Sequence, residues 1–324
     1  MAEKKPSCIV LGGSGFIGTN LCRRLANDGH RVRAFGRNCP FPEALEGIEW
    51  FQGDFGDAAS LAKAIETFDV IYHLVNGSTP LSANLDMAGD VQRNILSSLG
   101  LFEICRKLGV SRVVFVSSGG TIYGCAQQIP TPETAPTDPI TAYGINNLAI
   151  EKYLALYQHL HQIDYRILRI SNPFGPFQTS IKNQGVIASM ITRTLRNEAI
   201  EIWGDGSVVR DFIFVDDVVD ALVAAARDRS STRIFNIGSG EGHSLRQVLA
   251  SVEGLLDKKL NIQWKPGRPL DVPISVLAID RAREILGWTP KTSFEDGLNR
   301  TIAWWRHGDV FPGAAALDRL QRAR

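Results

Sequence analysis

The chain has neither a long apolar run nor a strong excess of one charge. No stretch approaches the roughly 20 apolar residues that a membrane-spanning helix needs, and residues 1–6 lack the apolar core of a secretory signal. The 35 basic and 34 acidic residues leave a net charge of +1. This balance gives no support to a nucleic-acid or anionic-membrane partner. We therefore expect a cytoplasmic protein.

Cysteine is scarce, and its pattern argues against two kinds of site. The five cysteines are odd in number, scattered, and without the spacing of metal ligands. Neither a disulfide framework nor a metal site is predicted, and reduced thiols are expected. The remaining composition is ordinary for a globular protein, and 324 residues suggest two domains or one domain with an added lobe.

One stretch near the amino terminus combines a buried strand, a glycine turn and a helix. Residues 8–11 are apolar and uncharged, as expected for a strand that is buried on both faces. Three glycines follow at intervals of three, ahead of apolar residues at helical spacing. Such glycines permit a tight turn and let a pyrophosphate approach backbone N–H groups. The stretch therefore predicts a dinucleotide site at Gly12, Gly15, Phe16, Ile17 and Gly18.

Strands and helices then alternate at the lengths of a parallel α/β sheet. Strands are predicted at 31–35, 49–52, 70–75, 113–116 and 165–170, and long helices at 90–108 and 141–160. Helical crossovers bring the carboxyl ends of parallel strands to one crevice. The pattern therefore predicts a doubly wound parallel sheet with its site at that edge. Four prolines between 130 and 139 predict an irregular loop.

The alternation is looser in the second half, which predicts a smaller lobe. Helices are predicted at 186–195 and 217–226, and strands at 201–203, 210–215 and 233–237. We expect a dinucleotide-binding domain over 1–172, to which 208–238 returns. Segments 173–207 and 239–324 are expected to form the substrate-binding lobe.

The ends of the second and third strands bear on the choice of cofactor. In an NAD site the residue that ends the second strand is usually acidic and bonds the adenosine ribose. Gly36 occupies this place and Arg37 follows it. An arginine here suits a 2′-phosphate, so NADP is an alternative to NAD; the other interpretation is a solvated arginine with NAD bound. Asp54 is a candidate acceptor for the adenine amino group, with Phe55 lining the ring, whereas a plain helix N-cap is expected of Asp57.

Several motifs, in a fixed order, resemble those of the extended short-chain dehydrogenase/reductases. They are the glycine turn, Asp54, Asn94, the segment from Ser117 to Gly124 and Tyr143. Segments 172–176, 210–212 and 268–271 are similar to the substrate-lobe motifs of nucleotide-sugar 4-epimerases and dehydratases. The dehydratases carry an Asp-Glu pair where this sequence has Gly120 and Thr121. The chain is therefore most similar to the UDP-sugar 4-epimerases.

The resemblance implies a Rossmann-like sheet with a smaller C-terminal α/β lobe. It implies an enzyme that inverts C4 of a UDP-hexose or UDP-N-acetylhexosamine through a transient 4-keto sugar, with bound NAD(P). Tyr143 would be the base, with Ser118 as the assisting hydroxyl and Thr121 in reserve. Further cofactor contacts are expected from Leu74, Asn94, Ser117, Tyr143, Asn147 and Pro173. Sugar-nucleotide contacts are expected from Ser118, Asn172, Gln184, Gly185, Arg210, Arg268 and Asp271. A homodimer is expected through the helices that carry Tyr143 and Asn94.

Asn147 is the main departure from the family pattern. The family has a lysine four residues after the tyrosine, and its charge helps the phenol to ionise, whereas an amide brings no charge. Asn147 can still bond the nicotinamide ribose, and Lys152 lies on the opposite helix face. Three explanations stay open: a substitution made to trap substrate, a slow natural enzyme, or a cation from elsewhere in the fold. Two rival functions follow, an NAD(P)H-dependent nucleotide-4-keto-sugar reductase and a non-catalytic nucleotide-sugar binding protein.

A second departure concerns the hydroxyl partner of the tyrosine. Counting back from Tyr123, Gly119 holds the place of the usual Ser or Thr. Ser118 and Thr121 flank it, although both can instead satisfy backbone groups at a strand end. Weaker substrate-site candidates are Lys182, Trp203 and Phe177, and His73 is expected to pack beside the cofactor without a catalytic or metal-binding role.

Overall fold

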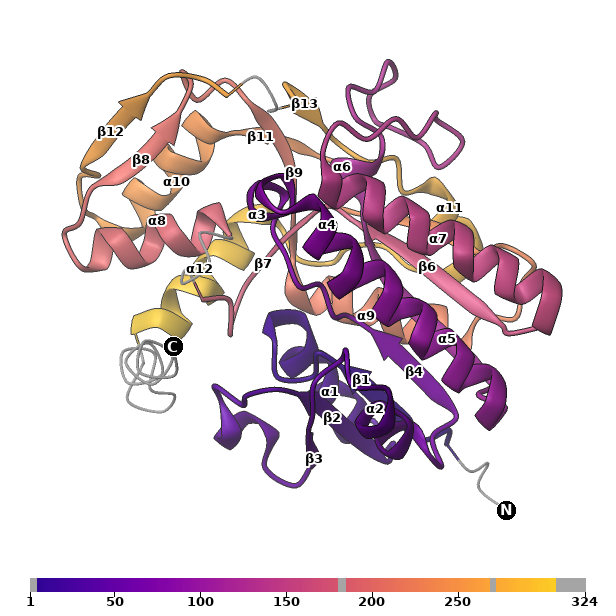
Figure 1. Ribbon diagram of the computed structural model, residues 1–324. Coiled ribbons are helices and arrows are strands. Elements are labelled where there is room, and N and C mark those ends of the chain that lie inside the picture. Colours follow the sequence, from indigo (N-terminus) through magenta and orange to yellow (C-terminus); the bar gives the residue numbers. More distant parts are fainter. Residues whose placement is uncertain (1–4, 180–184, 269–271, 307–324) are drawn as a thin grey trace.

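The structure, a computed structural model, describes residues 5–179, 185–268 and 272–306. Its largest sheet has seven parallel strands in the order β10-β6-β5-β4-β1-β2-β3 (Figure 1). These are β1 (Cys8–Leu11), β2 (Val32–Gly36), β3 (Glu49–Gln52), β4 (Val70–His73), β5 (Arg112–Ser118), β6 (Tyr165–Ile170) and β10 (Ile234–Ile237). The direction of winding reverses between β1 and β4, so the sheet is doubly wound and the predicted fold class is confirmed.

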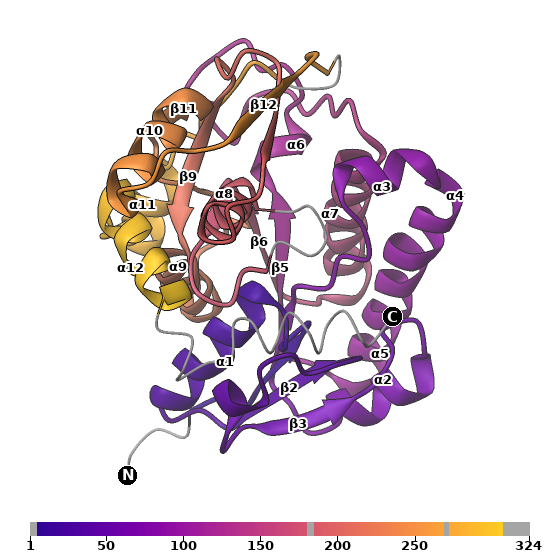
Figure 2. The ribbon, with the colours of Figure 1, turned by 90° about the vertical axis from the view of Figure 1, so that its left-hand side faces the viewer.

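Helices cover both faces of this sheet (Figure 2). One layer contains α1 (Phe16–Asn27) and α9 (Val215–Arg227), and the other contains α2 (Ala58–Ile65), α5 (Ser97–Leu108) and α7 (Ala142–His161). All four residues of β1 are buried because both of its faces are covered. The apolar, uncharged composition of this strand is thereby explained.

The helix predicted over 90–108 is irregular at its start. It consists of α4 (Met87–Asp90), a π-helical turn η2 (Val91–Leu96) and then α5. Asp90 and Asn94 are both buried at this irregularity. The chain reaches it through α3 (Pro80–Leu85), a short helix that the sequence patterns did not predict. Such π-helical turns occur often at functional sites.

The lobe is built on shorter strands and three helices. Its strands are β7 (Asn172–Phe174), β8 (Ile200–Trp203), β9 (Val209–Phe214), β11 (Gly242–Ser244), β12 (Ile262–Lys265) and β13 (Ile274–Ser275). Its helices are α8 (Val186–Leu195), α10 (Leu245–Leu256) and α12 (Phe294–Arg306). The remaining elements are the 3₁₀ turn η1 (Pro42–Leu45), α6 (Gly119–Ile122) and α11 (Asp280–Leu286).

The segment 208–238 divides between the two sheets. Strand β10 pairs with β6 at the edge of the seven-stranded sheet, and α9 packs on α1. Strand β9 instead pairs with β7, β11 and β13. By its hydrogen bonds, Val209–Phe214 therefore belongs with the lobe strands, and the predicted domain boundaries remain predictions.

Side-chain caps fix the starts of helices α7 and α2. Thr141 caps α7 by accepting from the Gly144 N–H at 3.2 Å. Asp57 caps α2 by accepting from the N–H groups of Ala59 and Ser60, so its predicted N-cap role is confirmed. Within the described ranges, no helix is both long enough and apolar enough to cross a membrane.

Candidate active site

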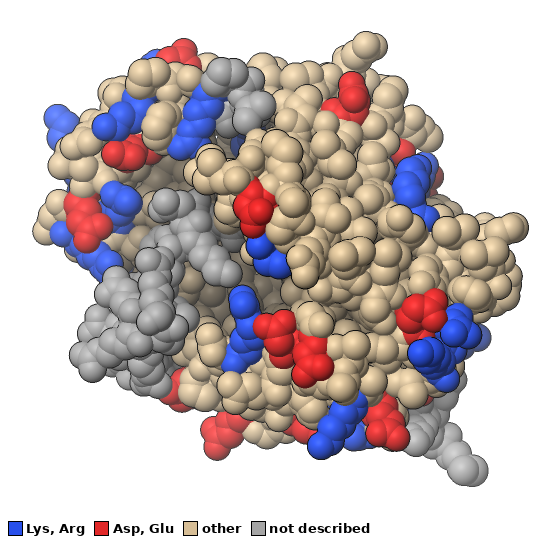
Figure 3. All heavy atoms as spheres, in the orientation of Figure 1, with Lys and Arg blue, Asp and Glu red and all other residues tan. Residues whose placement is uncertain are grey.

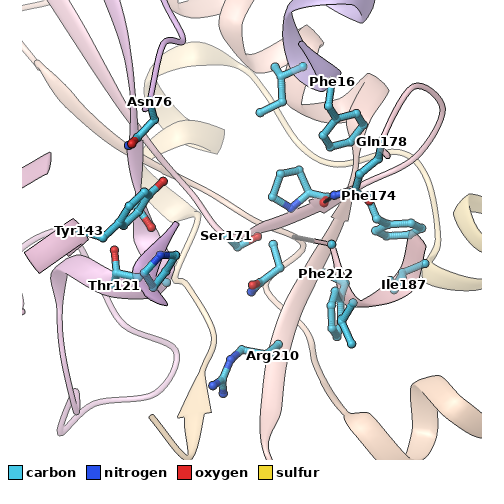
Figure 4. A pocket seen from close by; sticks show the side chains of 18 of the residues that line it. Phe16, Asn76, Thr121, Tyr143, Ser171, Phe174, Gln178, Ile187, Arg210 and Phe212 are labelled. Carbon is cyan, nitrogen blue, oxygen red and sulfur yellow. Dashed lines mark hydrogen bonds between the residues drawn. The ribbon is translucent and has the colours of Figure 1, made fainter. Parts of the chain in front are cut away.

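A cavity of about 680 Å³ opens at the carboxyl ends of β1, β4 and β5 and extends to the lobe. Its volume lies within the range of small-molecule sites. Three groups of residues line it: the glycine turn after β1, the polar ends of β4 and β5 with the start of α7, and lobe residues around β7, β8 and β9. Figure 4 shows Tyr143 and Thr121 on one wall and Arg210 reaching in from the lobe. The predicted crevice is therefore where the site lies.

The glycine turn leaves backbone N–H groups available to a ligand. Gly12 has a φ of +84°, which favours glycine, and its N–H bonds the Phe35 carbonyl. Gly15 caps α1 without any side-chain hydrogen bond, so the first-turn N–H groups have no side-chain acceptor. A Cβ on Gly18 would lie 2.1 Å from the Gly12 carbonyl oxygen, so only glycine permits this close packing. The turn thus fits the diphosphate of a dinucleotide, as predicted, and Phe16 and Ile17 line the cavity beside it.

The predicted adenosine contacts lie away from the cavity wall. A Cβ on Gly36 would lie 2.8 Å from Ser14 Oγ and 3.2 Å from the Trp50 ring, so an acidic side chain is disfavoured there. Arg37 is exposed. The exposed Asp54 accepts from the Gly56 N–H at 2.8 Å. None of these residues is in the cavity lining, and the roles of Arg37 and Asp54 stay predictions.

The aromatic and histidine side chains near this end are core residues. Phe55 is buried, with its ring centroid 4.9 Å from that of His73. His73 Nε2 lies 2.9 Å from Ser98 Oγ, and burial lowers the pKa of His73 to about 3, so its ring is neutral at physiological pH. No group of metal-ligating side chains occurs among the described residues. The role of Phe55 as a wall for the adenine stays a prediction.

Tyr143 enters the cavity from the first turn of α7. It is partly buried, and burial raises the pKa of its phenol to about 12; the Asn147 side chain lowers this pKa in part and the negative charge of Asp90 raises it. The phenol is therefore protonated at neutral pH in the absence of a ligand. The protonated phenol can donate a proton, but it can act as a base only when positive charge nearby lowers its pKa.

Asn147 does not line the cavity. It is buried, and its Nδ2 donates to the Tyr143 carbonyl oxygen at 2.8 Å. The amide therefore braces the first turns of α7 and supplies no charge to the phenol. Its predicted contact with the nicotinamide ribose stays a prediction.

The structure explains why no hydroxyl stands at position 119. A Cβ there would lie 2.5 Å from a methyl group of Leu277 and 3.0 Å from the Arg169 carbonyl oxygen. Ser118 and Thr121 both line the cavity instead. Thr121 Oγ1 is buried and has no hydrogen-bond partner among the described side chains and backbone. Such an unpartnered hydroxyl can bond a ligand oxygen without giving up another bond.

Two predicted cofactor contacts are engaged with the protein itself. Ser117 lines the cavity, but its hydroxyl donates to Glu151 Oε1 at 2.6 Å, and Glu151 in turn pairs with Arg169 at 2.7 Å. Asn94 accepts from the Gly77 N–H at 2.8 Å and donates to Asp90 at 2.8 Å. These hydrogen bonds fix the protein segments around the cavity. Direct contacts of Ser117 and Asn94 with the cofactor stay predictions.

The lobe presents cationic and aromatic groups to the cavity. Arg210 Nη1 donates to the Val272 carbonyl oxygen at 2.7 Å, which fixes the guanidinium at the cavity wall. Arg268 lies with its guanidinium carbon 4.0 Å from the centroid of the Trp203 ring. Trp203 is 38% exposed, so it is a cavity wall and not a core residue. Asn172 also lines the cavity, and its Nδ2 donates to the backbone of β9.

Other predicted contacts divide into three groups. Leu74, Pro173 and Gly185 line the cavity. Phe177 is buried against Phe41 and does not line it. Gln184, Asp271 and Lys182 lie outside the described residues.

Several cavity residues were not among the sequence candidates. Asn76 and Ser78 follow β4, and their position at the end of a parallel strand is a signal that points to a site. Gln178 also lines the cavity, with its Nε2 bonded to the Pro173 carbonyl oxygen at 3.0 Å. No motif in a single sequence marks Gln178.

Comparison with known proteins agrees with this geometry. Residues 8–238 match the NAD dependent epimerase/dehydratase family. The chain belongs to this family. It is 34% identical over 308 residues to a UDP-glucose 4-epimerase of Mycolicibacterium smegmatis, which covers 92% of this chain and 98% of that protein.

Solved structures of similar fold also include UDP-glucose 4-epimerases. A Thermotoga maritima UDP-glucose 4-epimerase with UDP-glucose has a TM-score of 0.89 at 33% identity, covering 93% of this chain and 99% of that one. A Thermus thermophilus UDP-glucose 4-epimerase in complex with NAD has a TM-score of 0.87 at 31% identity, with the same coverage. The expected family, the enzyme class and the NAD cofactor are confirmed.

Proposed function

We propose that this chain is a UDP-sugar 4-epimerase that acts on a UDP-hexose or UDP-N-acetylhexosamine. The observation that carries the proposal is the position of Tyr143 and Thr121. Both line the cavity between the glycine turn, which suits a dinucleotide diphosphate, and Arg210 and Arg268, which suit a second diphosphate. A sugar whose diphosphate bonds the arginines would reach the phenol. The similarity to UDP-glucose 4-epimerases over nearly the whole chain supports this substrate class.

NAD, when bound, would supply the hydride chemistry at C4 of the sugar. The residues of the chain accept and return the proton of the sugar O4 hydroxyl. The phenol of Tyr143 takes this proton and later returns it, while a hydroxyl from Thr121 or Ser118 bonds the same oxygen and holds it in place. The unpartnered Thr121 hydroxyl favours Thr121 in this role, whereas the sequence favoured Ser118.

The neutral residue at position 147 bears on the rate of this reaction. Because the pKa of Tyr143 is about 12, little phenolate exists at neutral pH until binding adds positive charge. Each unit by which the pKa stays high reduces the phenolate fraction about tenfold. We therefore propose a slow epimerase.

The decisive experiment incubates the purified protein with a panel of UDP-sugars and no added cofactor. Interconversion of a pair of C4 epimers is expected, since an epimerase returns its cofactor unchanged. Binding of UDP-sugars without turnover would instead support a non-catalytic binding protein.

The protonated state of Tyr143 favours one alternative. Reduction of a 4-keto sugar requires a proton donor at O4, and a phenol with a raised pKa is already in that form. A nucleotide-4-keto-sugar reductase would consume NAD(P)H in proportion to product, and this stoichiometry separates it from an epimerase.

We also propose that two copies associate through α5 and α7. Tyr153, Leu156 and Leu160 on α7 and Leu108 on α5 are exposed apolar side chains. In Figure 3, much of the surface over α7 is free of charged side chains, whereas the carboxyl-terminal half of α5 carries the exposed ion pair of Arg106 with Glu103. Exposed apolar side chains on neighbouring helices are the kind of surface that a second copy covers in a symmetric dimer.

A further inference from the structure

A carboxylate is buried near the helix that carries the active-site tyrosine. Asp90, the last residue of α4, is 0% exposed. Its Oδ1 accepts from Asn94 Nδ2 at 2.8 Å, and its Oδ2 accepts from Asn146 Nδ2 at 2.7 Å. Each carboxylate oxygen thus bonds a different element, the π-helical turn η2 and helix α7. Buried carboxylates of this kind are costly unless they are bonded, and this one is held by neutral amides.

The same cluster reaches the cavity lining. Asn94 Oδ1 accepts from the Gly77 N–H at 2.8 Å, and Asn94 Nδ2 lies 3.4 Å from Ser78 Oγ. Ser78 lines the cavity. On the other side, Asn146 lies on α7 between Tyr143 and Asn147. Asp90 therefore joins the loop after β4, the π-helical turn and the helix that carries the tyrosine.

The charge of Asp90 is only weakly compensated. Arg93 Nη2 is 4.0 Å from Asp90 Oδ1, and the Arg93 side chain is half exposed and bonds Asp86 at 2.9 Å. The negative charge of Asp90 raises the pKa of the Tyr143 phenol. The family's lysine at position 147, which would oppose this effect, is an asparagine here.

We propose that Asp90 is a positioning residue for Tyr143, whose carboxylate locks α7 to the cavity loop and sets the charge that the phenol experiences. The inference rests on the proposed function, because it assigns Asp90 a part in proton transfer at the sugar O4. Asp90 touches neither substrate nor cofactor in this role. It acts through Asn146 and Asn94.

The test removes the charge while keeping the shape. Asp90→Asn leaves one amide of the pair without an acceptor, and it removes the negative charge near the phenol. We expect kcat on the high-pH plateau, where the phenol is ionised in both chains, to fall about tenfold to a hundredfold, as for small misplacements of a reacting group, with KM within about twofold. Because the lost charge had raised the pKa of Tyr143, the rising limb of the pH profile should move to lower pH.

A swapped pair provides the rescue. In Asp90→Asn with Asn146→Asp, the amide at position 90 donates to the carboxylate at 146 and still accepts from Asn94. Recovery of kcat to within about threefold of the parent is expected, since the swap restores both hydrogen bonds of the cluster and with them the position of α7. Asp86→Asn is the matched control, because Asp86 bonds Arg93 but neither asparagine, and it should leave kcat and the pH profile unchanged.

A spectroscopic readout separates this inference from the proposed function. With tyrosine labelled at ¹³Cζ, the Tyr143 resonance is identified by its loss in Tyr143→Phe and is titrated without substrate. It should titrate at lower pH in Asp90→Asn than in the parent chain. If the parent converts no UDP-sugar, the proposed function fails, while this shift still tests Asp90.

Two results would overturn the inference. One is parent-like kcat, pH profile and resonance in Asp90→Asn. The other is a swapped pair that melts like the parent but recovers no activity. If Asp90→Asn does not fold, Asn146→Ser removes only the bond to α7, and an unchanged kcat in that variant would equally exclude a positioning role.

Discussion

Asn147 partly lowers the pKa of Tyr143 through its side chain but brings no positive charge to the phenol. Replacing it with lysine would place an ammonium group one helical turn from the phenol. A pKa lowered by one to two units would increase the phenolate fraction at neutral pH by about ten to a hundredfold.

We therefore expect Asn147→Lys to raise the epimerisation rate by about this factor, measured with the UDP-sugar that the panel identifies. Asn147→Gln is the control, because it lengthens the side chain without adding charge. Lysine without any gain, in a variant that still binds cofactor and sugar, would favour the non-catalytic binding protein.

The hydroxyl beside Tyr143 can be assigned by a pair of substitutions. Thr121→Val keeps the shape of the side chain and removes an oxygen that has no partner in the described protein. We expect kcat to fall about a hundredfold, the lower end of what a positioned proton-transfer group contributes. Ser118→Ala should have a smaller effect. The reverse order of the two effects, measured under the same conditions, would return the role to Ser118.

The sequence identifies these residues as candidates but does not show which groups surround them. The presence of the glycine turn, Tyr143 and Arg210 at one cavity could be predicted because each lies in a short motif. The unpartnered state of Thr121 could not, because it depends on what surrounds the hydroxyl in three dimensions. Likewise, the crowding at Gly119 comes from Leu277, which lies far away in the sequence.

At the scale of elements, the turn between β1 and α1 contains one glycine that the packing of the fold requires, Gly18, and one that leaves room for a ligand, Gly15. A Cβ on Gly18 would meet the Gly12 carbonyl oxygen at 2.1 Å, whereas a Cβ on Gly15 would lie 3.2 Å from it. Both glycines line the cavity. Their alanine variants should therefore differ in kind.

We expect Gly15→Ala to fold but to bind NAD about tenfold or more weakly, because its methyl group stands where the diphosphate approaches the backbone. Gly18→Ala should unfold at a clearly lower temperature. Calorimetric melting and NAD titration measure the two effects. Equal melting temperatures for the two variants would contradict this reading of the turn.

Elements of regular pattern were predicted closely, and irregular ones were not. Strands β3 and β6 and helix α8 have the predicted bounds. The π-helical turn at Val91–Leu96 has no such pattern in the sequence, although the buried Asp90 precedes it and the buried Asn94 lies within it. Helix α3 is short, and its cap by Thr79 and Ser82 is its main local signal.

At the scale of the whole molecule, the exposed helix pair should control association. Leu156 is an apolar side chain that is 45% exposed on α7. Leu156→Asp would place a charge in an apolar contact, and its burial would be strongly unfavourable. We expect a dimer in the parent chain and a monomer in this variant.

Light scattering after size exclusion measures the outcome. Ile274→Asp is the control, because Ile274 has the same 45% exposure but lies in the lobe. If the Leu156 variant stays dimeric, the interface lies elsewhere on the molecule. If the parent chain is a monomer, the proposed dimer does not form.

The path of the chain between its two sheets also limits how it can be divided. Strand β10 completes the large sheet, but it follows the lobe strands β7 to β9 in the sequence. Its Asn236 accepts a hydrogen bond from the Tyr123 hydroxyl at 2.7 Å. A fragment that ends before residue 234 would thus expose the edge of β6 and leave buried polar groups unbonded. The nucleotide-binding half cannot be excised as one continuous piece, and neither part is expected to persist without the other.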